Sequence, residues 1–249
     1  FCVYCGFCKK KIDRVDMMDM ENIKKLEPYI DAAASIYGSG RGEPLVYEKF
    51  EEFMEYTKES GMCNKLQIST NGMLLGEYKP EVFEKLNMLT ISFDSTQKRM
   101  FEILRFGAKF EVVRDNIVKI RKDLPNTFIS LTVTVNRLNV DHLSDIYEFA
   151  LENKINAVMF NNVYGSDDDK VIHLLRIRKS DESIYYSQMN IVERMNRQEI
   201  TKVFQYATFD GYEDNEELDK EKIYQELIEL KNTKPYIDFD AYTLGEDDC

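Results

Sequence analysis

Residues 128–136 read Phe-Ile-Ser-Leu-Thr-Val-Thr-Val-Asn, a run in which apolar and polar side chains alternate. Successive side chains of a strand point to opposite faces, so the run predicts a strand with one apolar face and one polar face. Residues 89–94, Leu-Thr-Ile-Ser-Phe-Asp, alternate in the same way. Both strands are therefore expected to lie in a sheet whose second face is polar.

Strands and helices alternate along the chain on both sides of this run. A first helix is expected over residues 19–33, and a strand over residues 32–37 ends at a glycine-rich loop, residues 38–44. This regular alternation predicts a parallel sheet with right-handed crossovers. Further strands are expected over 65–70, 88–93, 128–135 and 157–160, with helices over 47–60, 80–86, 97–104, 110–122 and 141–153.

The polar second face narrows the choice of fold. A parallel sheet that is covered by helices on both faces is apolar on both. A polar face instead favours a barrel whose helices lie outside and whose interior is wet or holds a polar cofactor. An ordinary half-exposed sheet is the alternative, because alternation alone does not show closure. We predict an α/β fold, a partial (β/α)6 TIM-like barrel with parallel strands and a site at their carboxyl ends.

The regular spacing stops beyond residue 162. Residues 164–169 read as a solvated loop, residues 180–197 show no clean apolar face, and one more helix is expected around residues 223–230. Three regions follow from this. We expect a partial barrel over residues 1–165, a barrel-closing helical region over 166–235, and the start of a C-terminal extension over 236–249.

Composition restricts the partners. The chain has 249 residues, 43% of them apolar, and a formal net charge of −12. Nucleic acids and anionic membranes are bound through an excess of Lys and Arg, so neither is expected as a partner. The sequence also has no apolar run of about 18 residues and no signal-peptide pattern. We therefore expect no membrane contact and a cytoplasmic location.

Three of the five cysteines, Cys2, Cys5 and Cys8, lie within the first eight residues. Thiolates this close on a tight loop suit a zinc ion or an iron–sulfur cluster. An odd number of cysteines in a chain of this length also favours metal ligation over a disulfide framework. Cys63, just before a strand, is expected to be a buried packing residue.

Four short motifs, in order, resemble those of the radical S-adenosylmethionine (radical SAM) enzymes. They are Cys2-Val3-Tyr4-Cys5, Gly-Arg-Gly-Glu-Pro at 40–44, Ile-Ser-Thr-Asn-Gly at 68–72 and Ile-Ser-Phe-Asp-Ser at 91–95. In that family three cysteines hold a [4Fe-4S] cluster, with an aromatic residue, here Tyr4, before the last. Cys2 and Cys5 would be the second and third ligands, and the first would precede Phe1.

Two explanations of this register stay open. Either the chain is truncated, or Cys2, Cys5 and Cys8 form an unusual triad. We favour truncation, with Cys8 as an uncertain ligand, and expect the chain to hold no stable cluster unless Cys8 substitutes. A zinc knuckle is the simpler alternative, although no fourth Cys or His follows nearby.

The resemblance also implies an activity. In this family the cluster leaves one iron open for the amino and carboxylate groups of S-adenosylmethionine. An electron donor such as flavodoxin or ferredoxin then drives its cleavage to a 5′-deoxyadenosyl radical, which abstracts a substrate hydrogen. The chain is most similar to the SPASM or twitch branch, so the substrate is expected to be a peptide or protein. Cys249 would be a candidate ligand of an auxiliary iron–sulfur cluster.

Other functions remain open at this point. One alternative is a radical SAM enzyme that acts on a sugar or another small molecule. Another is a non-catalytic zinc- or cluster-binding interaction module. The sequence identifies no general base.

The resemblance assigns cofactor contacts to residues at the strand ends. Gly42 and Glu43 would meet the methionine amino group, and Pro44 would fix the exit of the loop. Hydroxyl and carboxylate groups at the next two strand ends suit the carboxylate and the ribose, and Arg105 would pair with the carboxylate. The complete expected set is Tyr4, Gly42, Glu43, Pro44, Thr70, Asn71, Ser92, Asp94, Arg105 and Asn136.

Overall fold

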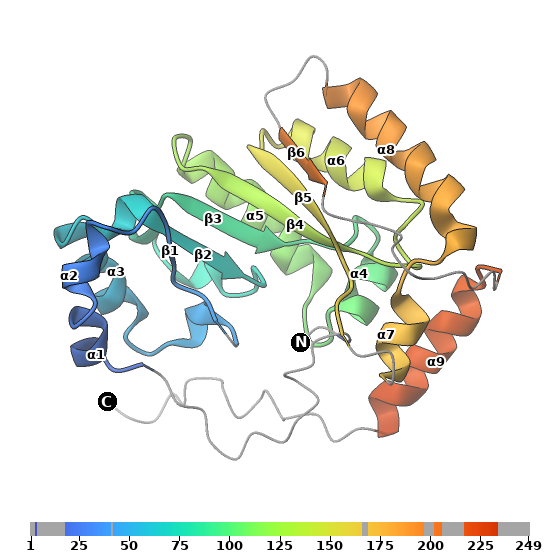
Figure 1. Ribbon diagram of the computed structural model, residues 1–249, viewed down its shortest axis with the longest axis horizontal. Helices are drawn as coiled ribbons and strands as arrows, with labels where there is room; N and C mark the ends of the chain where they lie inside the picture. The colour runs from blue at the N-terminus through green and yellow to red at the C-terminus, as the bar shows by residue number, and fades with distance from the viewer. Residues whose placement is uncertain are drawn as a thin grey trace.

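Six parallel strands form one sheet in the order β1-β2-β3-β4-β5-β6. Figure 1 shows the sheet running from β1 at one edge to β6 at the other. The computed structural model describes Val3 and residues 18–40, 42–165, 169–196, 202–205 and 217–233. The strands are β1 (Ile36–Tyr37), β2 (Leu66–Thr70), β3 (Met88–Ser92), β4 (Ile129–Val135), β5 (Ala157–Asn162) and β6 (Lys202–Gln205).

Helices connect successive strands. The α-helices are α1 (Met20–Lys24), α2 (Glu27–Ile30), α3 (Phe50–Glu59), α4 (Lys98–Leu104), α5 (Phe110–Asp123), α6 (Leu143–Glu152), α7 (Lys170–Leu175), α8 (Glu182–Asn196) and α9 (Lys220–Thr233). Short 3-10 helices are η1 (Pro44–Val46), η2 (Met62–Lys65), η3 (Leu75–Glu77), η4 (Pro80–Phe83) and η5 (Lys179–Asp181).

One face of the sheet is apolar and covered by helices. Ile68, Leu89 and Ile129 are register partners on β2, β3 and β4, and all three are fully buried. They belong to one core cluster with buried side chains of α3, α5, α6 and α8. Burial of this face is the main stabilising contribution that the strand pattern can supply. Core side chains from these helices include Met54, Val113, Ile117, Ile146 and Met189.

The opposite face of the sheet is polar. Ser69, Thr90 and Ser130 occupy one register row, and Ser92 and Thr132 occupy the next row toward the carboxyl ends. The observed register therefore places the hydroxyl groups of successive strands side by side. Together with the parallel strand order, this confirms the predicted α/β partial barrel.

A second apolar cluster lies where α4, α7 and α9 meet. It includes Leu104 of α4, Leu175 of α7 and Ile223 of α9, all buried. Figure 1 shows α7 and α9 lying alongside each other, and the two helices are in contact. Val3 belongs to the same cluster, so a residue from the beginning of the chain packs with its last described helix.

Three expectations about local structure need correction. The first helix is two short helices, because the chain turns at Lys25 and Leu26 and Pro28 opens the next segment. Residues 180–197, expected to show no clean apolar face, form the helix α8, whose buried Tyr185, Met189 and Val192 do repeat at helical spacing. The strand β6, which is only four residues long, was not predicted, and α7 was not predicted as a separate helix within the helical region expected over 166–235.

Two smaller findings complete the fold. Cys63 is buried and has no disulfide partner, which confirms its predicted packing role. No helix in the described part of the chain is long and apolar enough to span a bilayer.

Candidate cofactor site

The Glu43 carboxylate ties the glycine-rich loop after β1 to the end of β2. Its Oε1 accepts a hydrogen bond from the Thr70 hydroxyl at 2.6 Å, and its Oε2 accepts one from the Asn71 amide at 2.7 Å. Oε1 also accepts the Leu45 amide hydrogen at 3.2 Å and so caps η1. Hydrogen bonds to a charged acceptor are stronger than neutral ones. The structure thus brings together three of the predicted contacts, Glu43, Thr70 and Asn71.

Burial raises the pKa of the Glu43 carboxyl above its ordinary value. Hydrogen bonds from Thr70, Asn71 and Leu45 stabilise the carboxylate and oppose this effect, but burial is the larger cause. The loop is therefore held by the Glu43 carboxyl group, whose ionisation is opposed by its burial.

Two glycines give these loops their shape. Gly72 has a φ of 81°, and a Cβ there would lie 3.0 Å from side-chain atoms of both Ile91 and Val113. Gly42 has a φ of 115°, but an added Cβ would have no atom within 4 Å. L side chains rarely adopt such backbone conformations. Gly72 thus serves close packing, whereas the exposed Gly42 leaves its backbone open to a ligand.

Asp94 and Arg105 form a buried ion pair, with Oδ2 and Nε 2.8 Å apart. Asp94 Oδ1 also accepts a hydrogen bond from the Thr134 amide at 2.8 Å, which joins the end of β3 to β4. Both side chains were predicted to contact the cofactor. The structure places them together and gives each a partner in the protein, while direct contact with the cofactor stays a prediction.

Asn136 shapes the loop after β4. Its Oδ1 accepts the Leu138 amide hydrogen at 3.0 Å, and its Nδ2 donates to the Thr134 carbonyl at 2.8 Å. Its own amide donates to Asn139 Oδ1 at 2.8 Å. Asn136 is fully buried, so its side chain satisfies local backbone groups. Contact between Asn136 and a cofactor stays a prediction.

On β3 and β4, the accessible part of the polar face lies near the strand ends. Ser92 and Thr132 are half-buried register partners, and Asn161 Nδ2 donates to Thr132 Oγ1 at 2.9 Å. Farther from the carboxyl ends, Thr90 and Ser130 are buried and hydrogen-bond to each other at 2.9 Å. On these two strands, a ligand would therefore meet Ser92 and Thr132 before Thr90 and Ser130.

Two polar residues of this region were missed from the sequence. Asn161 was missed because β5 was expected to end at residue 160, whereas it continues to Asn162. Ser39 was treated only as part of a glycine-rich turn, yet its hydroxyl accepts the Ser69 amide hydrogen at 2.7 Å. Strand length and loop contacts of this kind depend on neighbouring strands, which are distant in sequence.

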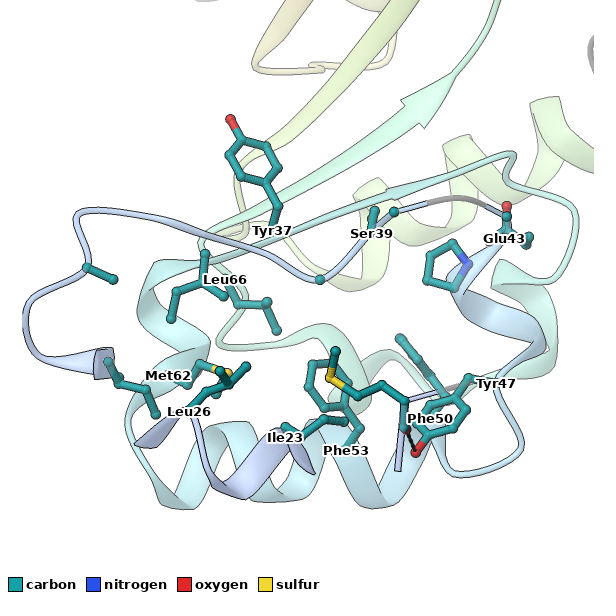
Figure 2. Close-up of a pocket in the computed structure, with 18 of the residues that line it drawn as sticks. Ile23, Leu26, Tyr37, Ser39, Glu43, Tyr47, Phe50, Phe53, Met62 and Leu66 are labelled. Atoms are coloured by element: carbon teal, nitrogen blue, oxygen red, sulfur yellow. Dashed lines mark hydrogen bonds between the residues drawn. The ribbon is translucent and has the colours of Figure 1, made fainter. Parts of the chain in front are cut away.

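An apolar cavity of about 690 Å³ lies beside the glycine-rich loop, and residues of that loop form part of its lining. Figure 2 shows Ile23, Leu26, Phe53 and Met62 grouped around it, with Glu43 at one end. S-adenosylmethionine carries a sulfonium, an amino and a carboxylate group, and burying charged groups in an apolar lining is costly. The polar strand ends therefore suit that cofactor better than this cavity does.

The predicted cluster ligands lie outside the described residues. These are Cys2, Cys5 and Cys8, together with Tyr4 and the auxiliary candidate Cys249. Val3, between Cys2 and Tyr4, is described, and its amide donates a hydrogen bond to the Leu104 carbonyl at 3.0 Å. Since Arg105 follows Leu104 and pairs with Asp94, this hydrogen bond places Val3 near the carboxyl end of β3.

The order of cysteines, glycine loop and polar strand ends matches a known family. Residues 1–150 match the profile of the Radical SAM superfamily. The chain belongs to the Radical SAM superfamily. Members of this superfamily are enzymes that use a [4Fe-4S] cluster and S-adenosylmethionine.

Similarity to individual radical SAM proteins is more distant. GTP 3',8-cyclase of Peptoclostridium acidaminophilum is 23% identical over 217 residues, which cover 84% of this chain and 65% of the relative. Streptococcus suis SuiB bound to S-adenosylmethionine has a TM-score of 0.65 at 15% identity, over 83% of this chain and 47% of SuiB. The chain thus spans less than two thirds of either protein.

A third protein, anSMEcpe with bound AdoMet and Cp18Cys peptide, shares the same fold. Its TM-score is 0.61 at 17% identity, over 81% of this chain and 59% of that chain.

The chain's residues fit the two cofactors of the superfamily. Cys2 and Cys5 are cysteines, whose thiolates are the soft ligands that iron–sulfur clusters require. The open Gly42 backbone and the half-buried Ser92 hydroxyl offer polar groups for the amino acid part of S-adenosylmethionine.

Proposed function

We propose that this chain is the core of a radical SAM enzyme. Cys2 and Cys5 would hold the [4Fe-4S] cluster, and the ends of β1, β2 and β3 would bind S-adenosylmethionine. When bound, these cofactors together supply a 5′-deoxyadenosyl radical that abstracts a hydrogen atom from the substrate. The main support is the Glu43 carboxylate, which joins the Gly42 loop to Thr70 and Asn71.

Individual roles follow from exposure and existing contacts. Gly42 offers backbone groups to the cofactor's amino group, with Glu43 and Pro44 holding the loop in place. Asn71 and Ser92 are half-buried at neighbouring strand ends and would contact the carboxylate side of the cofactor. The other contacts expected from the sequence, Tyr4, Thr70, Asp94, Arg105 and Asn136, stay predictions, as does Cys8 as a ligand.

We propose a peptide or protein as the substrate, with flavodoxin or ferredoxin as the electron donor. The fold shared with SuiB and anSMEcpe supports this proposal, since both proteins are described with peptides bound. A small-molecule substrate is the second candidate, and the similarity to GTP 3',8-cyclase favours it. The division at residue 165 and a SPASM-like extension from residue 236 also remain proposals.

Cofactor chemistry can be tested directly. The protein is reconstituted anaerobically with iron and sulfide, reduced with dithionite and incubated with S-adenosylmethionine. Where the ligand set is complete, through Cys8 or in a chain extended to include the first family cysteine, we expect a broad visible absorption band from the cluster and release of 5′-deoxyadenosine, measured by liquid chromatography and mass spectrometry. Stoichiometric zinc with no cleavage would instead support the non-catalytic module. Stimulation of 5′-deoxyadenosine release by added GTP would favour the small-molecule candidate.

A further inference from the structure

Val3, which stands between the predicted cluster ligands Cys2 and Cys5 in the sequence, is bound to the C-terminal end of α4. The Val3 amide donates a hydrogen bond to the Leu104 carbonyl at 3.0 Å. The Val3 side chain is only 6% exposed and belongs to the same apolar cluster as Leu104. Because Val3 directly follows Cys2, a displacement of Val3 also displaces the backbone of Cys2.

The Leu104 carbonyl requires a donor from outside its helix. Leu104 is the last residue of α4, and the last carbonyls of a helix have no partner within it. The residue is fully buried, and leaving a buried carbonyl unpaired is costly. The position of this carbonyl therefore determines where the Val3 amide can bind.

The end of α4 is fixed by the neighbouring ion pair. Arg105 caps α4, and its Nε lies 2.8 Å from Asp94 Oδ2, with both side chains buried. Asp94 is held in turn by the Thr134 amide on Oδ1 and by Asn139 Nδ2 on its carbonyl, at 2.8 and 3.0 Å. The contacts form a continuous path from β4 through Asp94 and Arg105 to Leu104.

The geometry points to Asp94 and Arg105 as positioning residues for the cysteine segment. Their ion pair sets the end of α4, and this end sets where the Val3 amide docks, one residue after Cys2 in the sequence. Lysine cannot reproduce this arrangement, because it lacks the planar guanidinium fork. The inference rests on the proposed function only in taking Cys2 and Cys5 as cluster ligands.

Hydrogen exchange at the Val3 amide measures this docking without any cofactor. In the metal-free chain, Asp94→Asn/Arg105→Gln replaces the ion pair by neutral groups and is expected to speed Val3 exchange by about tenfold. Arg105→Lys, a milder change, should give a smaller increase in the same direction. In the reconstituted protein, both variants should also lose iron to a chelator faster than the wild type.

Arg121→Gln is the matched control. Arg121 is also a buried arginine, but it binds Asn156 and the Thr127 carbonyl, close to the amino end of β4. Its loss should leave Val3 exchange unchanged, although it removes comparable buried contacts.

The outcomes separate this inference from the proposed function. Wild-type Val3 exchange in a folded ion-pair variant would overturn the positioning role, and so would an equal effect of Arg121→Gln. If the double variant does not fold, Arg105→Lys decides between the same two results. Failure to cleave S-adenosylmethionine would overturn the proposed function alone, because Val3 exchange is measured without the cofactors.

Discussion

The Thr70 hydroxyl lies 2.6 Å from Oε1 of Glu43, so the end of β2 holds the carboxylate of the loop that follows β1. The two residues are 27 positions apart in the sequence. Their contact holds the loop that contains the exposed Gly42 at the end of β2, where the Asn71 amide binds the second carboxylate oxygen. The proposed cofactor site depends on this connection.

Glu43 should make stability depend on pH. Because burial raises its pKa, the folded protein binds this proton more tightly than the unfolded chain does. Its contribution to stability is complete below the unfolded pKa, about 4.3, and is lost as pH rises through the raised pKa. The difference in free energy of unfolding between the wild type and Glu43→Gln should fall across this pH range. The fall should be ~1.4 kcal/mol for each unit by which folding raises the Glu43 pKa. Urea titrations from about pH 4 to about pH 7 measure it.

Glu55→Gln is the control for this effect, because Glu55 is an exposed residue of α3. If the difference in free energy of unfolding between the wild type and Glu43→Gln does not change with pH, the raised pKa of the Glu43 carboxyl group is contradicted.

Ser92 and Ser130 lie on the same polar face, but their substitution by alanine should have different effects. The Ser92 substitution should weaken cofactor binding, whereas the Ser130 substitution should destabilise the fold. Ser92→Ala removes a half-buried hydroxyl at the proposed site, so stability should change by less than about 0.5 kcal/mol. Affinity for S-adenosylmethionine should fall about fivefold, as for one lost hydrogen bond of about 1 kcal/mol. Equilibrium dialysis measures the affinity.

Ser130→Ala should instead leave affinity unchanged and destabilise the fold by roughly 1–3 kcal/mol, because it leaves the buried Thr90 hydroxyl without its partner. Equal effects of the two substitutions on affinity would place the cofactor elsewhere.

Gly42 should tolerate alanine less well than its neighbour Gly40. Gly42→Ala forces an L side chain into a positive φ and should cost about 1 kcal/mol of stability. Its affinity for S-adenosylmethionine should fall as well, because the loop backbone must shift. Gly40→Ala is the control, since its added Cβ meets no atom within 4 Å and no positive φ is recorded there. Identical stability and affinity in the two variants would remove Gly42 from the site.

Cys8 decides how many thiolates this chain offers to a cluster. If the first family ligand precedes Phe1, the chain alone should bind iron substoichiometrically, and any retained iron should be lost in Cys8→Ser. Iron and sulfide quantitation after reconstitution provides the measurement, with Cys63→Ser as the control because Cys63 is buried in the core. Full iron occupancy that survives Cys8→Ser would contradict the missing-ligand interpretation.

Periodicity predicted the elements that pack locally, and failed where packing partners are distant. The strands over 65–70, 88–93 and 128–135 were located within a residue or so, since their alternation reflects the two faces of the sheet. The apolar face of α8 was missed because it combines Tyr185 with Met189 and Val192, and tyrosine is ambiguous as an apolar signal.

The sequence by itself determined the parallel β/α order, the polar second face and the family, because alternation and short motifs are local properties of a chain. Only the tertiary structure showed that Glu43 binds Thr70, that Asp94 binds Arg105 and that Val3 docks on α4. These contacts join residues that are 11 to 101 positions apart. Such pairs meet only once the sheet has formed, and no local pattern of residue types encodes which polar group will face which.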